Sequence, residues 1–329
     1  MFGLMGDVLM RSALLRELRQ LEPNSSMVCY VDKAGEEVLL LSHDPLRAVR
    51  TVDRFTGGLS GLFEKLLLIW KFRRERFDLV LDLYNSPSSR RMLSFSGCGR
   101  RIWIKGGVVR TNFLSPEPVM MKEKSSHLNN LYFQMLSILW PAHTPKGFLP
   151  WVDSTINASG GPPTLRGNYL ISLAAGDPRK YIPIPCASLI AEYLYREHQL
   201  VPVVARNPAL EILQEQFCES LKESGVPFDR LSLMSLSGIL DILEQLRFSI
   251  LPDTGLFHLA LGLRKPVLGV FTYTNPALVD PRVPWVEFVF KEASPKVLDQ
   301  HACPVGTADL TPSEVSHALQ GFLFRRALV

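Results

Sequence analysis

The sequence predicts an α/β fold built of two Rossmann-like, doubly wound domains that face a cleft. Two stretches of the 329-residue chain each alternate short apolar runs with amphipathic segments of helical length, a pattern typical of β-α-β units and parallel sheets. The chain is also too long for one ordinary core and suits two domains of roughly 150 residues each. Between the two stretches lies a segment rich in Ser, Gly, Pro and Asn, WVDSTINASGGPPTLRGN. Its composition is typical of an interdomain linker and its flanks.

The first domain is expected to cover residues 1–152. Its short apolar runs predict strands, and its amphipathic segments predict the helices between them. Strands are expected within 25–32, 48–55, 77–84 and 100–105, and helices within 12–21, 62–74 and 128–140.

The second domain is expected to cover residues 169–310, after a linker at 153–168, and it repeats the alternation. Strands are expected within 169–176, 200–206, 228–234, 248–253 and 266–271, and helices within 186–198, 209–224, 236–246 and 255–263. A terminal helix is expected within 311–329, where Thr311 and Glu314 have the spacing of a capping box.

Composition narrows the classes of protein to consider. With 47% hydrophobic and 21% charged residues the chain is expected to be globular. No run reaches the roughly 18 uncharged apolar residues that a membrane span needs, and no signal-peptide pattern is present, so a cytoplasmic location is expected. Five scattered cysteines without a C-x-x-C pair favour free thiols in a reducing compartment and predict no metal site.

Charge is distributed unevenly along the chain. Residues 1–150 carry 21 Lys and Arg against 14 Asp and Glu, a balance of +7, whereas the remainder carries 15 against 18, a balance of −3. The basic half is suited to an anionic partner, although an ordinary solvated surface explains the balance equally well. No nucleic-acid-binding module is recognisable, so nucleic acid is not the expected partner. No G-x-G-x-x-G follows a strand, which argues against a dehydrogenase.

The first candidate site lies near the N-terminus, in GDVLMRSALLREL. A very short strand is expected to end at Gly6 and Asp7, with a helix directly after it. Glycine permits a tight turn and a close approach of the backbone, and the aspartate would then face the cleft. The alternative is that Asp7 is a plain N-cap of the helix.

The second candidate site is DTGLFHLA, which follows the apolar strand FSILP. Asp253, Thr254 and the Gly255 amide would stand at a helix start, where free N–H groups and the helix dipole bind anions. His258 is one helical turn further along, so its ring is expected to reach the same anion site at the helix start. The alternative is that Asp253 merely caps the helix and that His258 is a buried core residue.

A third segment, SLAAGDPRKYIP, follows the first strand of the second domain. Small residues through Gly176 would let a ligand come close, and Arg179 and Lys180 would offer positive charge. The alternative for these two cations is that both are solvated loop residues.

Taken in order, these motifs resemble glycosyltransferase family 9, the ADP-heptose:lipopolysaccharide heptosyltransferase family. The resemblance covers nearly the whole chain and is carried by GDVL, FDLVLDLY, RKYIP and, most specifically, DTGLFHLALGLRKPVLGVF with NP soon after. It implies the GT-B arrangement and an inverting, metal-independent transfer of a sugar from a nucleotide sugar, without a cofactor. ADP-heptose is the implied donor, and the implied acceptor is an anionic glycolipid of the lipopolysaccharide-core type at the cytoplasmic face of the inner membrane. It also implies a last helix, 311–329, that packs back on the first domain.

The resemblance also implies roles for single residues. Asp7 would be the general base that takes the proton from the acceptor hydroxyl, with Gly6 beside it. On the donor side, Lys180 would contact the phosphates and Asp253 the donor hydroxyls, while Met234 would pack on the adenine. The donor diphosphate would be surrounded by Gly176, Thr254, Gly255 and His258.

Several departures from the family pattern leave a second interpretation open. Only five residues precede Gly6, Ser12 stands where a proline is common, and Ile182 replaces the tryptophan of a Trp-Pro pair. A divergent, inactive member that binds a nucleotide sugar or acts as a scaffold is therefore the alternative to an active transferase. A sugar-nucleotide 2-epimerase is disfavoured because the extra acidic residues it needs near the diphosphate helix are missing.

Overall fold

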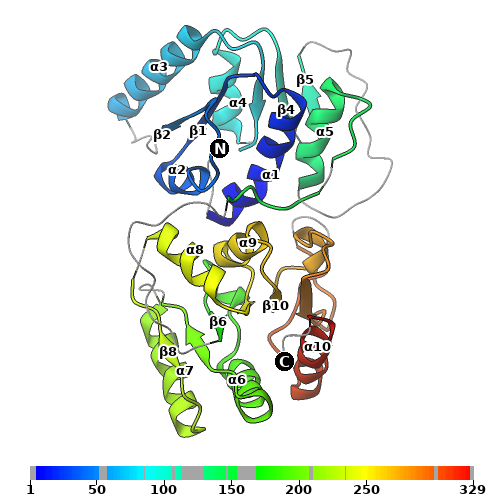
Figure 1. Ribbon diagram of the computed structural model, residues 1–329. Helices are drawn as coiled ribbons and strands as arrows, with labels where there is room; N and C mark the ends of the chain where they lie inside the picture. The colour runs from blue at the N-terminus through cyan, green and yellow to red at the C-terminus, as the bar shows by residue number, and fades with distance from the viewer. Residues whose placement is uncertain are drawn as a thin grey trace. The chain divides into compact units, whose positions relative to one another are not determined.

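The computed structural model divides the chain into two units, Met1–Phe148 and Leu149–Val329, and each unit has an apolar core of its own (Figure 1). The structure describes residues 5–51, 58–84, 86–105, 108–112, 129–145, 147–153, 168–206, 210–233, 235–299 and 303–326. Most of the predicted linker at 153–168 and the site residue Met234 lie outside these ranges. Both units are of the predicted α/β class.

In the residues that the structure describes, the first unit has two small sheets. In one sheet, β1 (Met27–Val31) pairs in parallel with β2 (Arg47–Thr51). In the other, β3 (Val80–Asp82) pairs in parallel with β4 (Arg101–Lys105), which pairs antiparallel with β5 (Val108–Thr111). The accompanying helices are α1 (Met5–Leu21), α2 (Lys33–Leu39), α3 (Gly58–Glu75), α4 (Pro87–Ser94) and α5 (Asn129–Leu139).

The N-terminal motif differs from its prediction. Gly6 and Asp7 lie in the first turn of α1, not at the end of a strand. Buried residues recur with helical spacing at Val8, Leu9, Ser12 and Ala13, so the helical pattern already begins at these positions. Asp7 therefore lies at the helix N-terminus, where the helix dipole stabilises a negative charge.

The described residues of the second unit form a six-stranded parallel sheet in the order β11-β10-β9-β6-β7-β8. Its strands are β6 (Tyr169–Ile171), β7 (Pro202–Val204), β8 (Asp229–Arg230), β9 (Phe248–Leu251), β10 (Val267–Phe271) and β11 (Val286–Phe290). The first of these strands in the chain, β6, lies beside the fourth, β9, so the chain winds outward in both directions from this pair. This is the doubly wound order predicted for the domain.

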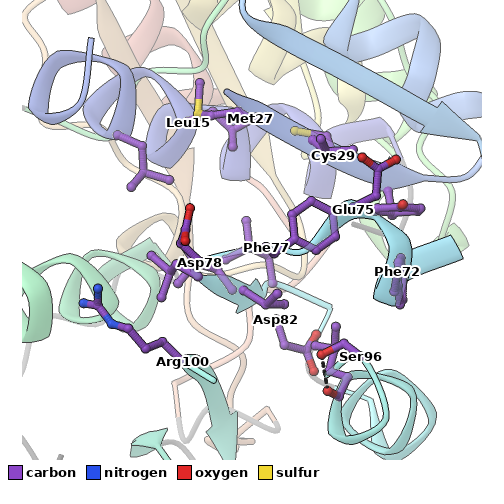
Figure 2. Close-up of a pocket in the computed structure, with 18 of the residues that line it drawn as sticks. Leu15, Met27, Cys29, Phe72, Glu75, Phe77, Asp78, Asp82, Ser96 and Arg100 are labelled. Atoms are coloured by element: carbon purple, nitrogen blue, oxygen red, sulfur yellow. Dashed lines mark hydrogen bonds between the residues drawn. The ribbon is translucent and has the colours of Figure 1, made fainter. Parts of the chain in front are cut away.

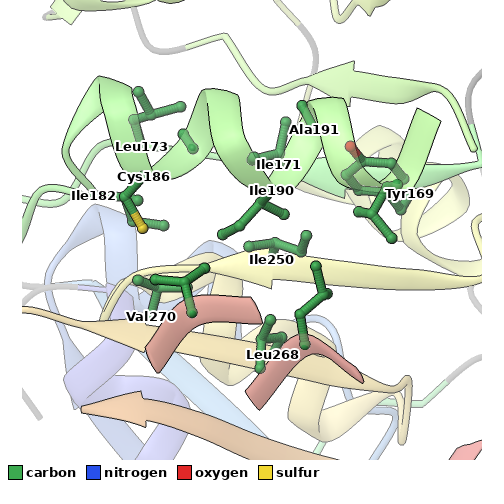
Figure 3. Close-up of a cluster of buried hydrophobic side chains, with 14 of the residues drawn as sticks. Tyr169, Ile171, Leu173, Ile182, Cys186, Ile190, Ala191, Ile250, Leu268 and Val270 are labelled. Atoms are coloured by element: carbon green, nitrogen blue, oxygen red, sulfur yellow. The ribbon is translucent and has the colours of Figure 1, made fainter. Parts of the chain in front are cut away.

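Helices cover this sheet and close the core of the second unit. They are α6 (Ile184–His198), α7 (Glu211–Glu223), α8 (Leu236–Gln245), α9 (Gly255–Gly262) and α10 (Pro312–Arg326), with short 3₁₀ turns η1 (Pro178–Lys180) and η3 (Pro276–Leu278). Ile190 and Ala191 of α6 pack against sheet residues such as Ile250 and Val270 (Figure 3). Every residue of β9 is buried, as expected for a central parallel strand.

The terminal helix α10 packs on the second unit. Val315, Leu319, Phe322 and Leu323 are buried in the core of that unit, and the Phe322 ring meets Phe248 of β9 edge-on at 5.6 Å. This face of the helix is therefore used within the second unit. The contact of 311–329 with the first domain stays a prediction.

No helix in the ranges that the structure describes combines the length and the apolar character needed to cross a bilayer.

Candidate functional site

The predicted DTG turn lies at the point where the strand order of the second sheet reverses. The turn follows β9, the loop containing Gly176 follows β6, and these two parallel strands are neighbours, so their carboxyl ends lie at one edge of the sheet. In doubly wound sheets this switch point is where ligands bind, because the two crossover connections diverge there and leave room. Topology alone therefore marks this edge as the candidate site.

Asp253 is the centre of the site. Its side chain is only 10% exposed, and Lys180 Nζ donates to its Oδ2 at 2.5 Å. Thr274 Oγ1 donates to the same oxygen at 2.6 Å, and His258 Nε2 lies 3.6 Å from Oδ1. Burial acts to raise the pKa of this carboxyl, but His258 and Lys180 outweigh it and hold the pKa well below its usual range. Asp253 is therefore held as a carboxylate.

The 3₁₀ turn that carries Lys180 is fastened to the loop after β10. Thr272 Oγ1 donates to the Arg179 carbonyl at 2.8 Å, and the Arg179 guanidinium lies 4.1 Å from the centroid of the Tyr273 ring. Arg179 Nη1 also donates to Tyr273 Oη at 2.9 Å. These contacts fix the backbone beside Lys180, so its ammonium reaches Asp253 from a defined position.

Helix α9 begins at the DTG turn. Thr254, not Asp253, is the N-cap, and its hydroxyl accepts from Phe257 N at 3.4 Å. The hydroxyl proton of Thr254 remains free to be donated, since accepting uses only a lone pair. Gly255 is the first helical residue, so its amide belongs to the N-terminal group of donors that favours an anion.

His258 is a buried residue, as the alternative interpretation of the sequence expected, and yet it contacts Asp253. Its side chain is 3% exposed and meets the Phe257 ring edge-on at 5.4 Å. It therefore supports the Asp253 carboxylate from within the core. Its predicted contact with a diphosphate stays a prediction.

Sequence reasoning missed Thr274. This residue lies in the FTYTNP segment after β10, which is the neighbour of β9 in the sheet. Polar residues directly after a buried strand were the available signal, but using it required knowledge that β10 lies beside β9.

Gly176 and Asp7 complete the predicted set among the described residues. Gly176 is exposed on the loop between β6 and η1. Asp7 and Gly6 belong to the first unit, where the half-buried Asp7 side chain lines a cavity of about 1310 Å³. Figure 2 shows this cavity, with Met27 and Cys29 of β1 on one side and Asp82 of β3 on the other. The residues found to line that cavity all belong to the first unit.

The segment that leads into the second unit packs against α9, the helix of the DTG turn. A Cβ atom placed on Gly262, the last residue of α9, would lie 2.6 Å from Val152 Cγ2 and 3.4 Å from Pro150 Cβ. The distance to Val152 is shorter than side-chain atoms tolerate, so a larger residue at 262 would require Val152 to move.

Comparison with known proteins places these features in a family. The family model described as glycosyltransferase family 9 (heptosyltransferase) matches residues 66–303. No curated protein matches the sequence.

Among solved structures, E. coli heptosyltransferase WaaC with ADP-2-deoxy-2-fluoro heptose superposes with a TM-score of 0.68 at 15% identity, covering 97% of each chain. The glycosyltransferase family 9 structure from Veillonella parvula gives a TM-score of 0.71 at 14% identity, covering 98% of this chain and 96% of that one. E. coli ADP-heptose lps heptosyltransferase II gives 0.68 at 16% identity, covering 99% and 98%.

These likenesses extend over whole chains and show a common GT-B fold, while the family model spans more than half of the sequence. Both the predicted fold class and the predicted family are therefore confirmed. The chain belongs to glycosyltransferase family 9, the heptosyltransferase family, and is a glycosyltransferase.

Proposed function

We propose that the protein transfers a sugar, in the first instance heptose from ADP-heptose, to a lipopolysaccharide core-type acceptor, with inversion and without a metal ion or cofactor. The observation that carries the proposal is the Lys180–Asp253–Thr274 cluster at the strand-order switch point, beside the N-terminus of α9. E. coli heptosyltransferase WaaC, which shares this fold, has been solved with ADP and with ADP-2-deoxy-2-fluoro heptose, and these complexes support a nucleotide sugar as the donor.

On the donor side, the positive charges match a departing diphosphate. Lys180 and the free N–H groups at Thr254 and Gly255 would stabilise the negative charge that grows as the bond from the anomeric carbon to the phosphate oxygen breaks. Asp253 would accept hydrogen bonds from donor hydroxyls. We further propose that Gly176 admits the donor closely, that Met234 packs on the adenine and that His258 orients Asp253.

On the acceptor side, we propose Asp7 as the general base. Its carboxylate would take the proton as the acceptor oxygen attacks the anomeric carbon, so that a C–O bond forms as the C–O bond to the diphosphate breaks. A positioned base of this kind contributes on the order of 10²–10⁴-fold to a rate. We further propose that Gly6, in the same helical turn, leaves room for the acceptor.

The exposed face of α3 supports the proposal that the acceptor is held in a membrane. Phe63, Leu66, Leu67 and Trp70 are 41–69% exposed and recur at the i, i+3, i+4 and i+7 spacing of one helix face. Exposed basic residues flank them, among them Arg74, whose guanidinium lies 4.7 Å from the Trp70 ring centroid. An apolar stripe with basic neighbours suits the boundary of an anionic bilayer. We propose that this stripe contacts the inner membrane at its cytoplasmic face.

The test is mass-spectrometric detection of transfer or hydrolysis from a panel of nucleotide sugars, followed by three variants. Asp7→Asn should lower turnover by about 10²–10⁴-fold while ADP-heptose still binds. Lys180→Met should weaken ADP binding about 10- to 100-fold, the value of a charge-assisted hydrogen bond, whereas the exposed α7 variant Lys222→Met should bind normally.

Two outcomes would contradict this assignment. Equal turnover rates for Asp7→Asn and the parent would show that Asp7 is not the general base. ADP-sugar binding without turnover of any donor would instead support the inactive, nucleotide-sugar-binding alternative.

A further inference from the structure

The loop after β6 brings cations to the Asp253 site that are already paired with carboxylates. Lys180 Nζ donates to Asp253 Oδ2 at 2.5 Å. The Arg179 guanidinium donates to Asp177 through Nε at 3.1 Å and through Nη2 at 2.6 Å. The positive charge of this loop is therefore balanced by negative charge, and a phosphate that meets Lys180 also meets Asp253.

The carboxylate of Asp253 is fixed in place and stays charged. Its Oδ2 accepts from both Lys180 and Thr274, which belong to the loops after β6 and β10, and His258 faces its Oδ1 from α9. These partners hold its pKa below the usual range although the side chain is only 10% exposed. A buried charge that is held from three elements is screened much less than a charge on the surface.

This carboxylate immediately precedes the turn that favours an anion. Thr254 is the N-cap of α9 and Gly255 is its first residue, so the free N–H groups of the helix begin within two residues of Asp253. Like charges that are close together repel strongly where water is largely excluded. A phosphate at this turn is therefore attracted by the helix N-terminus and by Lys180, and it is repelled by Asp253.

A nucleotide sugar and a free nucleoside diphosphate bring different charges to this turn. The terminal phosphate of a free diphosphate loses a second proton with a pKa of about 6, whereas a phosphate esterified to a sugar has no such proton. Transfer of the sugar leaves the bridging oxygen on the diphosphate, so the product is more negative than the donor at neutral pH. The donor also brings hydroxyls that can donate to Asp253 Oδ1, which lies 3.6 Å from His258 Nε2 and retains lone pairs.

We propose that Asp253 is a specificity-determining residue that makes the site favour a sugar-bearing nucleotide diphosphate over free ADP. Its carboxylate accepts hydrogen bonds from the sugar of the donor and repels the diphosphate once the sugar has left, which promotes release of the product. The inference rests on the proposed function, because it takes the Asp253 site as the place where the donor diphosphate binds.

The test is calorimetric titration of the full chain near neutral pH with ADP and with the β-methyl ester of ADP. The ester lacks both the second ionisation and the sugar. Asp253→Asn should bind ADP at least about tenfold more tightly than the parent, because a neutral amide of similar shape replaces the repelling charge. The gain in affinity for the methyl ester should be at least about threefold smaller than the gain for ADP.

Two further variants separate the charge of Asp253 from other effects. Glu219→Gln removes one negative charge from an exposed position of α7 and should leave the affinity for ADP unchanged. Thr274→Val removes a hydrogen bond to Asp253 Oδ2 but keeps the carboxylate, so it should not tighten ADP binding. Circular dichroism checks that each variant is folded, and Asp253→Ser takes the place of Asp253→Asn if the latter does not fold.

Several outcomes would overturn the inference while the parent still binds ADP and the proposed donor site stands. They are an equal or lower ADP affinity of the folded Asp253 variant, an equal gain for the methyl ester, and an equal gain in Thr274→Val or Glu219→Gln. A parent that binds no ADP would instead contradict the donor site itself, and this inference would fall with it.

Discussion

At the scale of single residues, the defining feature of the protein is a carboxylate that is buried and fully partnered. Asp253 receives Lys180 and Thr274 on one oxygen and faces His258 with the other. The cost of burying its charge is offset by these partners, which explains why its pKa is lowered despite burial. The site is thus organised as an anionic centre within a ring of donors.

The lowered pKa of Asp253 predicts a pH dependence of stability. Because the folded-state pKa lies below the unfolded value of about 4, the carboxylate stabilises the fold fully above that value and loses its contribution as pH falls through the folded pKa. Urea unfolding should therefore show the parent more stable than Asp253→Asn at pH 5 and above, and the difference should shrink below pH 4. The exposed-site variant Asp309→Asn is the control. A difference that grows as pH falls would contradict the assignment.

At the scale of elements, local chemistry explains where α10 begins. Thr311 N donates to Glu314 Oε2 at 2.7 Å and Glu314 N donates to Thr311 Oγ1 at 3.3 Å, which confirms the predicted capping box. Pro312 then occupies the first helical position, where its missing N–H is not needed. The local sequence sets where the helix begins, but it does not determine which apolar surface the buried face of the helix covers.

The exposed stripe of α3 predicts binding to anionic vesicles. Phe63→Ser combined with Trp70→Ser should lower partitioning into vesicles that contain anionic lipid by at least about tenfold, because two large apolar side chains no longer enter the interface. Sedimentation with vesicles measures this directly. Ile212→Ser, at a 78% exposed position of α7, should have no effect. Equal partitioning of the double variant and the parent would exclude the stripe as the contact.

At the scale of the whole molecule, the alternation of apolar runs was sufficient to predict the class and the doubly wound order of the second unit. It was not sufficient for β11, whose half-exposed Glu287 bonds to Arg325 and weakens the apolar signal of an edge strand. The sequence also placed Lys180, His258 and Asp253 in one candidate site, and they are in contact. Thr274 was missed because strand order, which brings the loop after β10 to Asp253, is set by tertiary packing.

The two units should differ in stability. The second has a six-stranded parallel sheet, whereas the described part of the first has sheets of two and three strands on either side of a cavity. Sheets with few strands are less stable on their own than larger sheets. Native-state hydrogen exchange should therefore be slower in β6, β9 and β10 than in β1, β3 and β4, by at least about tenfold. Equal protection in both units would contradict this expectation.

The contact of Gly262 with Val152 constrains how this lineage can diverge. A larger residue at position 262 is tolerated only if the residue at position 152 becomes smaller. These two positions are more than a hundred residues apart in the chain, and we expect their side-chain sizes to change together among related sequences. A bulkier residue at 262 beside an alanine or glycine at 152 would be the trace that such an exchange leaves behind.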